Sequence, residues 1–152
     1  MREMAHNYRI QIVEDQYFVA MDCQQALEDA GFECTGLAAS AERALELATR
    51  DHPDFLLMDI RLSGAMDGVD VATRIYKDHG IRSIFSSAHA DSATRHRAEQ
   101  AHPLGWLQKP FTPDHLIEAV KIAIEELDDE AAATLTSSKT ASSGRNWSRD
   151  WS

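Results

Sequence analysis

Five polar side chains follow short apolar or β-rich segments of the chain, at the points where strands would end. Glu14 and Asp15 follow the first such segment, Asp59 the third, Ser87 the fourth and Lys109 the fifth. Because ligands of open α/β sheets sit at the carboxyl ends of the strands, these side chains are expected to converge on one crevice. That crevice would hold three carboxylates, one hydroxyl and one ammonium.

A crevice of this composition predicts the capture of a phosphoryl group. Carboxylates packed closely repel one another unless something neutralises them. Mg²⁺, or Mn²⁺ in its place, does this through oxygen ligands and keeps water and phosphate in its remaining positions. One carboxylate oxygen can then attack phosphorus and form an aspartyl phosphate. The ammonium and the hydroxyl would stabilise the charge on the transferred group.

Each part of this constellation is weak when it is taken alone. An acidic pair such as Glu14-Asp15 is common at a solvated strand end, and Lys109-Pro110 by itself indicates only a turn. Asp59 is harder to explain in this way, because burial beside other acids costs free energy unless a function requires it. Taken together, the separated residues favour the functional interpretation.

The segments that would position these residues alternate between strand and helix patterns over the first 127 residues. Apolar residues recur at helical spacing between the predicted strands. Five strands alternating with five helices predict an α/β, flavodoxin-like (βα)5 fold, a doubly wound parallel sheet with strand order 2-1-3-4-5. The strands are predicted at residues 8–13, within 32–38, and at 55–58, 81–86 and 105–108.

Length and composition are those of one ordinary soluble domain. The chain has 152 residues, 43% of them apolar, and 25 acids against 15 Lys and Arg, for a net charge of −10. Such a field repels nucleic acid, so a nucleic-acid partner is not expected. Apolar runs are too short for membrane insertion, and no secretory signal is visible, so a cytoplasmic location is predicted. Cys23 and Cys34 are expected to be reduced thiols.

The character of the chain changes at Asp128. The Ala-, Ser- and Thr-rich segment 128–152 contains few large apolar residues, so it is predicted to be a disordered tail after a domain of residues 1–127. Trp147 and Trp151 stand four residues apart within it. The favoured interpretation is a disordered terminus, and the alternative is a short helical anchor on a partner. No separate output domain is expected to fit in these residues.

With these residues, the chain resembles the CheY-like receiver domain of bacterial two-component response regulators over about residues 8 to 127. Four separated signatures occur in the family's order and after the right elements. The resemblance implies that Asp59 is the phosphoacceptor and that Asp15 binds Mg²⁺ directly, with Glu14 in the same acid pocket. It also implies that the backbone carbonyl of Arg61 joins the metal ligands.

The resemblance further assigns the hydroxyl, the cation and the aromatic residue of the switch. Ser87 would move toward the phosphoryl group, and it is preferred over Ser86 because the small Ala88 follows it, as in the family pattern. Lys109 would be the counter-charge, followed by a cis peptide bond to proline. Trp106 stands at the position of the switch aromatic, usually Tyr or Phe.

Two further positions and one loop distinguish this chain within the family pattern. Arg61 and His89 flank the phosphoryl site, where family members tune the lifetime of the aspartyl phosphate. The segment 62–68 after Asp59 lacks the frequent proline and is one residue longer than the commonest form.

The predicted function is that of a single-domain response regulator. It would accept a phosphoryl group on Asp59 from a sensor histidine kinase or a histidine phosphotransfer protein. A conformational change would then be read by a partner protein on the face of helix four, strand five and helix five, with a homodimer as another use of that face. The alternatives are a phosphorelay intermediate or phosphate sink, an unphosphorylated interaction module, and an aspartyl-phosphate phosphatase. Since Asp59-Ile60-Arg61 lacks the second acid of a haloacid-dehalogenase-type site, the chain is not predicted to be an enzyme.

Overall fold

The computed structural model describes the backbone of residues 7–144 and the side chains of residues 7–135. At its centre lies β3 (Phe55–Asp59), a strand in which every residue is buried. It pairs in parallel with β1 (Arg9–Val13) on one side and with β4 (Arg82–Ser87) on the other. Two edge strands, β2 (Glu33–Ala38) and β5 (Gly105–Gln108), complete the order β2-β1-β3-β4-β5.

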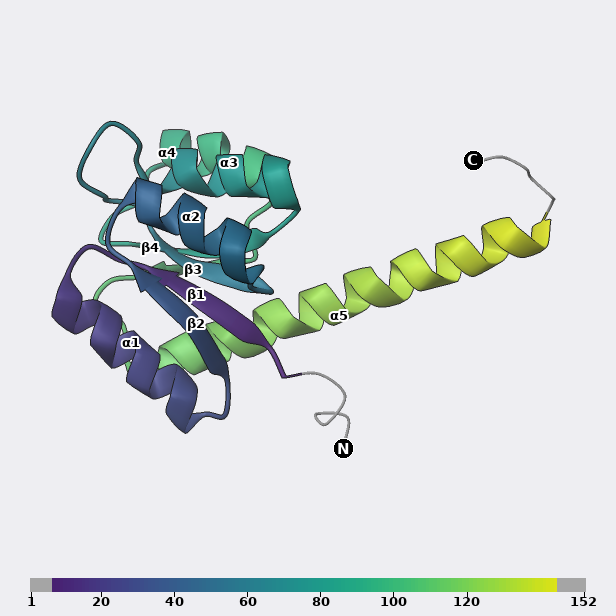
Figure 1. The fold of residues 1–152 in the computed structure, drawn as a ribbon, viewed down its shortest axis with the longest axis horizontal. Helices are drawn as coiled ribbons and strands as arrows, with labels where there is room; N and C mark the ends of the chain where they lie inside the picture. Colours follow the sequence, from purple (N-terminus) through teal and green to yellow (C-terminus); the bar gives the residue numbers. More distant parts are fainter. Residues whose placement is uncertain (1–6, 145–152) are drawn as a thin grey trace.

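Helices cover both faces of this sheet. Figure 1 shows α2, α3 and α4 on one side of the strands and α1 and α5 on the other. The doubly wound flavodoxin-like fold predicted from the sequence, with its strand order, is therefore confirmed. The helices lie at Tyr17–Asp29 (α1), Ala41–Asp51 (α2), Gly68–His79 (α3), Ser92–Ala98 (α4, followed by a 3₁₀ turn at Glu99–Ala101) and Pro113–Gly144 (α5).

The core divides into two layers because side chains of β3 alternate between the two faces of the sheet. Phe55 and Leu57 pack in the layer beneath α1 and α5. Leu56 and Met58 pack in the layer beneath α2, α3 and α4. A strand buried on both faces has to be apolar throughout, which is why the polar residue Asp59 marks its end.

Capping residues and one glycine set where the helices begin. Ser40 caps α2 by accepting a hydrogen bond from the backbone N–H of Arg43, and Pro113 is the first residue of α5. At the start of α3, a Cβ on Gly68 would lie 2.0 Å from the carbonyl oxygen of Asp59. Only glycine therefore lets α3 begin directly against the end of β3.

The structure corrects the sequence prediction at the carboxyl-terminal end of the chain. Residues 128–152 were predicted to be a disordered tail, whereas the backbone of α5 continues to Gly144. Arg82 on β4 pairs with Glu126 and Glu130, which holds the helix where it leaves the domain. Beyond these pairs, the alanines at 131–133 are strong helix formers. The apolar content of the segment reflects neither the ion pairs of Arg82 nor the helix propensity of the alanines.

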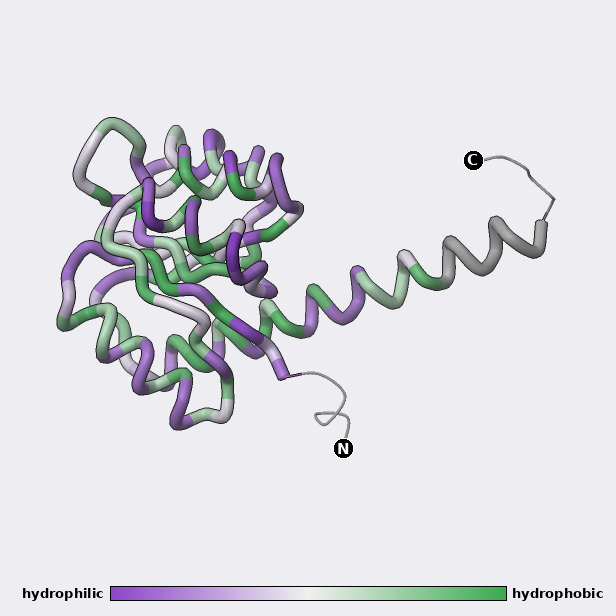
Figure 2. Tube along the Cα trace, in the orientation of Figure 1, coloured by the Kyte–Doolittle hydropathy of each residue, from purple (hydrophilic) through white to green (hydrophobic). Residues whose placement is uncertain are grey.

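The extension carries little apolar surface. In Figure 2 a hydrophilic band on α5 is followed by the paler turns that contain the alanines. Leu135 is the exposed large apolar side chain in these turns. Trp147 and Trp151 lie outside the residues that the structure describes.

Two further observations concern membrane-spanning helices and the two cysteines. Within residues 7–144, no helix is long and apolar enough to cross a membrane. Cys23 and Cys34 are free cysteines, and burial raises the pKa of the Cys23 thiol to about 11. At neutral pH Cys23 is therefore protonated and a poor nucleophile.

Candidate functional site

Three carboxylates meet at the carboxyl end of the sheet. Glu14 and Asp15 follow β1 directly, and Asp59 is the last residue of the neighbouring strand β3. Each offers one ligand atom, and these atoms all lie within 4.8 Å of one another. Glu14 and Asp59 are buried, whereas Asp15 is exposed. The structure thus brings together the acids that the sequence placed on separate strand ends.

Lys109, which follows β5, supplies the positive charge of the cluster. Its Nζ donates a hydrogen bond to Glu14 Oε1 at 2.9 Å and lies 3.4 Å from Asp59 Oδ2. Its backbone N–H donates to the carbonyl of Ser87 at 2.8 Å, which ties the end of β5 to the end of β4. The Lys109-Pro110 peptide bond is cis, as the resemblance implied.

The charges of this cluster do not balance, and the pKa of Asp59 reflects the imbalance. Burial, and to a smaller extent the negative charge of Glu14, raise the pKa of Asp59 to about 6 against the opposing charge of Lys109. Burial by itself would lower the pKa of Lys109. The hydrogen bond to Glu14 and the charge of Asp59 outweigh that effect and raise it. With three carboxylates and one ammonium, the cluster favours the binding of a further cation.

Comparison with known proteins places this geometry in a family. Residues 10–121 match the family model of the response regulator receiver domain. The chain belongs to the response regulator receiver family. It is 30% identical over 124 residues to the transcriptional regulatory protein PdtaR of Mycobacterium tuberculosis, covering 82% of this chain and 60% of that protein's length.

Two further relatives are matched over almost their whole length. Sporulation initiation phosphotransferase F of Bacillus subtilis is 31% identical over 116 residues, which cover 76% of this chain and 92% of that protein. The receiver domain of a modulated diguanylate cyclase from Desulfovibrio desulfuricans superposes with a TM-score of 0.75 at 33% identity. That match covers 82% of this chain and 99% of the other.

The acidic pocket of this receiver domain fits a hard divalent cation. Mg²⁺ prefers oxygen ligands and is commonly held by one or two carboxylates, with water and phosphate oxygens completing the octahedron. Glu14, Asp15 and Asp59 offer three carboxylate oxygens within one small region. Burial and the negative charge of Glu14 raise the pKa of Asp59, and a bound cation would offset both effects. Donor chemistry and charge therefore both suit Mg²⁺ or Mn²⁺.

Other predicted site residues lie at or just beyond the ends of β3 and β4. The backbone N–H of Arg61 donates to Asp59 Oδ1 at 3.3 Å. Ser87 is the last residue of β4, and its Oγ accepts a hydrogen bond from the backbone N–H of His89 at 3.0 Å. Its alternative, Ser86, is the residue that pairs with Asp59 in the strand register. The roles of Arg61, Ser87 and His89 in phosphoryl chemistry remain predictions.

Trp106 of β5 is half-buried between two partners. Its indole stacks on Phe85 with ring centroids 5.0 Å apart. The guanidinium of Arg95, from α4, lies over the Trp106 ring, 4.5 Å from the ring centroid. Strand register brings Phe85 and Trp106 together, because they are opposite one another in the β4–β5 pair. Arg95 was not anticipated from the sequence, since a cation on a polar helix gives no sign of what it covers.

Ser63 is a second residue that sequence reasoning missed. It lies between β3 and α3, and its Oγ donates to Asp15 Oδ2 at 3.3 Å. The length that the resemblance attributed to the segment after Asp59 was the available signal, but it did not indicate which side chain would reach the acids.

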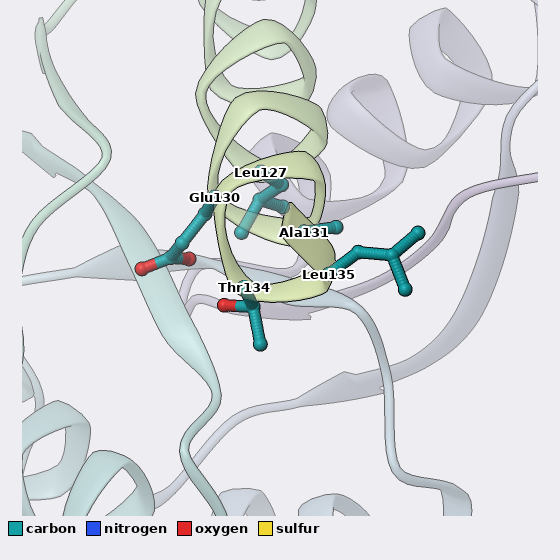
Figure 3. A pocket seen from close by; sticks show the side chains of 5 residues that line it. All are labelled: Leu127, Glu130, Ala131, Thr134 and Leu135. Carbon is teal, nitrogen blue, oxygen red and sulfur yellow. The ribbon is translucent and has the colours of Figure 1, made fainter. Parts of the chain in front are cut away.

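A shallow pocket lies elsewhere on the molecule, on α5. Figure 3 shows its lining side chains on successive turns of the helix, with Leu135 projecting outward from the helix. Glu130 in this lining pairs with Arg82 at the start of β4, the end of the sheet opposite to the acids. The pocket is therefore separate from the acid cluster. Its lining consists of Leu127, Glu130, Ala131, Thr134 and Leu135.

Proposed function

We propose that this receiver domain accepts a phosphoryl group on Asp59 in a Mg²⁺-dependent reaction and signals to a partner protein by a change of conformation. The donor is the phosphohistidine of a sensor histidine kinase or of a histidine phosphotransfer protein. The observation that carries this proposal is the cluster of three carboxylate oxygens within 4.8 Å, with Lys109 in contact with two of the carboxylates.

In the proposed reaction a carboxylate oxygen of Asp59 forms a bond to phosphorus while the bond from phosphorus to the donor imidazole nitrogen breaks. The imidazole keeps the electron pair of that bond. Glu14, Asp15, Asp59 and the backbone carbonyl of Arg61 would hold the cation, which would supply positive charge beside the transferred group. No enzyme activity is proposed beyond slow loss of the phosphoryl group from Asp59.

The remaining residues have roles after transfer. The ammonium of Lys109 moves from its carboxylate partners to a phosphoryl oxygen, and the Ser87 hydroxyl donates to another. Trp106 follows the movement of Ser87 and alters the face of α4, β5 and α5, where a downstream protein or a second copy binds. Arg61 and His89 flank the phosphoryl group and set its lifetime by controlling the approach of water.

An apolar surface beside the acids supports docking of a protein donor. Tyr17, Phe18 and Met21 at the start of α1 are 64%, 79% and 39% exposed. Two of them follow Asp15 by two and three residues, and their rings are in edge-to-face contact. Exposed apolar side chains gathered in this way mark a site of protein interaction.

A phosphorelay intermediate is the second candidate role. The Bacillus subtilis relative, 92% of whose length is covered by the match, is named a phosphotransferase. In that role Asp59 would pass its phosphoryl group to another histidine rather than hold it for a downstream partner.

The phosphoacceptor is tested with Asp59→Asn. The amide has no carboxylate oxygen to offer, so phosphate incorporation from a cognate kinase or from acetyl phosphate with Mg²⁺ is expected to be abolished. Intact-mass spectrometry gives the readout, and Asp78→Asn, which changes an exposed acid on α3, should label like the wild type. Retained labelling of Asp59→Asn at the wild-type level contradicts the assignment.

The docking surface is tested with Phe18→Ala. Loss of an anchoring aromatic is expected to slow transfer from the phosphorylated donor protein by roughly tenfold. Labelling by acetyl phosphate, which needs no protein contact, should stay unchanged. Ile122→Ala removes a similarly exposed apolar side chain from α5 and is the matched control. Equal slowing with both phosphodonors would place the effect in the site and not in docking.

A further inference from the structure

The three clustered carboxylates are not held in the same way. Glu14 and Asp59 are 6% and 4% exposed, and both are in contact with Lys109. Asp15 is exposed, and Ser63 donates a hydrogen bond to its Oδ2 at 3.3 Å. A carboxylate on a freely rotating exposed side chain is oriented only by such a partner, and metal ligands depend on partners of this kind.

Ser63 lies on a loop that is fixed at both ends. In this β3–α3 loop (residues 60–67), Leu62 and Met66 pack against the core layer beneath α2, α3 and α4. At its end, the backbone N–H of Gly68 donates to the carbonyl of Ile60 at 2.8 Å, and no side chain would fit there. The loop is thus closed on itself at its base, and its exposed tip carries Ser63 toward the acids.

Helix α4 braces the same loop. Asp67 caps α3 and exchanges hydrogen bonds with Asp70 in a capping box. Arg97 of α4 reaches both acids, with Nη2 2.6 Å from Asp67 Oδ2 and Nη1 3.3 Å from Asp70 Oδ1. A single side chain of α4 therefore holds the end of the loop whose tip contacts Asp15.

We propose that Ser63 is a positioning residue of the metal site, which holds the Asp15 carboxylate toward Glu14 and Asp59, and that Arg97 acts behind it by holding the loop. The inference rests on the proposed binding of Mg²⁺ by these acids. The inference gives a function to the segment after Asp59, for which the resemblance indicated a departure from the family pattern. This loop, longer and without the usual proline, places the hydroxyl of Ser63 beside Asp15.

The test measures the Mg²⁺ affinity of the intact chain by isothermal titration calorimetry. Ser63→Ala is expected to raise the dissociation constant by roughly three- to tenfold, below the range for buried outer-shell partners because this hydrogen bond is exposed. Ser63→Thr keeps a hydroxyl and should bind within about twofold of the wild type. Arg97→Ala acts through the loop and should raise the constant by about two- to threefold.

The control is Arg74→Ala, which removes an exposed ion pair to Asp78 on α3 without touching the loop. It should bind Mg²⁺ like the wild type. Hydrogen exchange of the amides at 61–67 supplies a readout without metal, and Arg97→Ala and not Arg74→Ala should speed it. Since Ser63 is exposed, thermal unfolding of Ser63→Ala without Mg²⁺ is expected to match the wild type.

Several outcomes overturn the inference. Ser63→Ala that binds Mg²⁺ as tightly as the wild type, or more tightly, shows that the hydroxyl does not position Asp15. Ser63→Thr that binds as weakly as Ser63→Ala shows that the hydroxyl is not the cause, and Arg74→Ala that matches Arg97→Ala removes the role of the loop. A wild-type chain that binds no Mg²⁺ overturns the proposed function itself, so the two failures are distinguishable.

Discussion

Each end of the sheet has one cation paired with two carboxylates. At the carboxyl end, the side chain of Lys109 is 20% exposed, and the side chains of its partners Glu14 and Asp59 are each 5% exposed. At the amino end of β4, Arg82 is 10% exposed, whereas Glu126 and Glu130 are 49% and 57% exposed. At one end the carboxylates are buried, and at the other end only the cation is buried.

This difference distinguishes a binding site at the carboxyl end of the sheet from a purely structural contact at the amino end. Arg82 also donates to the backbone carbonyls of His102 at 2.7 Å and Pro103 at 3.4 Å, so its donors are satisfied and its partners stay solvated. Around Lys109 the buried carboxylates keep an excess of negative charge, to which Asp15 adds. A buried cation with solvated partners needs nothing further, whereas buried anions in excess favour a bound cation.

Removing the cation from the carboxyl end should have the largest effect. Lys109→Met leaves Glu14 and Asp59 buried without a counter-charge, which should cost about 3 kcal/mol of unfolding free energy near neutral pH. The loss should shrink at about pH 5, because the folded state then takes up protons on these acids, and added Mg²⁺ should restore part of it. Urea unfolding measures it, and Lys121→Met on the exposed side of α5 is the control. A loss of equal size at both pH values contradicts the comparison.

Removing the cation from the amino end should cost less. Arg82→Met leaves two carbonyls without a donor but lets Glu126 and Glu130 remain in water, so the loss should be about 2 kcal/mol. It should not depend on Mg²⁺, and helical circular dichroism should fall as the extension of α5 frays. Arg74→Met, which breaks an exposed pair, should change stability by less than about 0.5 kcal/mol. Rescue of Arg82→Met by Mg²⁺ would refute the separation of the two ends.

Removing a buried anion should have the smallest effect and the opposite sign. The pKa of Asp59 is raised from 3.8 to about 6, so the folded state binds this proton more readily than the unfolded state. The contribution of Asp59 to wild-type stability therefore falls as pH rises from about 4 to about 6, and Asp59→Asn should remove this contribution. Near neutral pH without Mg²⁺ the variant should be more stable by about 1–2 kcal/mol.

The control for this sign is Asp51→Asn. The side-chain hydrogen bond from Arg50 lowers the pKa of Asp51, so its contribution is present above the ordinary pKa and is lost as pH falls. Replacing Asp51 should therefore lower stability near neutral pH, whereas replacing Asp59 should raise it. Unfolding measured from about pH 4 to about pH 7 distinguishes the two slopes. If both variants shifted stability in the same direction, burial would not be what sets the Asp59 carboxyl apart.

The fold and the convergence of the acids were predictable because their signals are local. A run such as Phe55–Met58 is long enough to identify a buried strand, and the polar residue that follows it marks the strand's end. Once the strands are known to be parallel, their carboxyl ends must share one edge, so Glu14, Asp15, Asp59 and Lys109 meet without further information.

The helical extension was not predictable by the same reasoning. The segment after Asp128 was judged by its apolar content, which measures only whether a segment can build a core. What holds α5 there is a set of polar contacts from β4, some 44 to 48 positions away in the chain, through Arg82 to Glu126 and Glu130. No window of sequence contains both sides of these ion pairs.

The sequence by itself determined the order of the elements, the strand ends and the residue types that gather there. Periodicity and turn chemistry act between neighbours in the chain, and they are therefore readable without a structure. Only the tertiary structure decided that Ser63 contacts Asp15, that Arg95 covers Trp106 and that Arg82 anchors α5. These side chains are polar and come from distant segments, so their partners are chosen by the packing of the sheet and not by any local pattern.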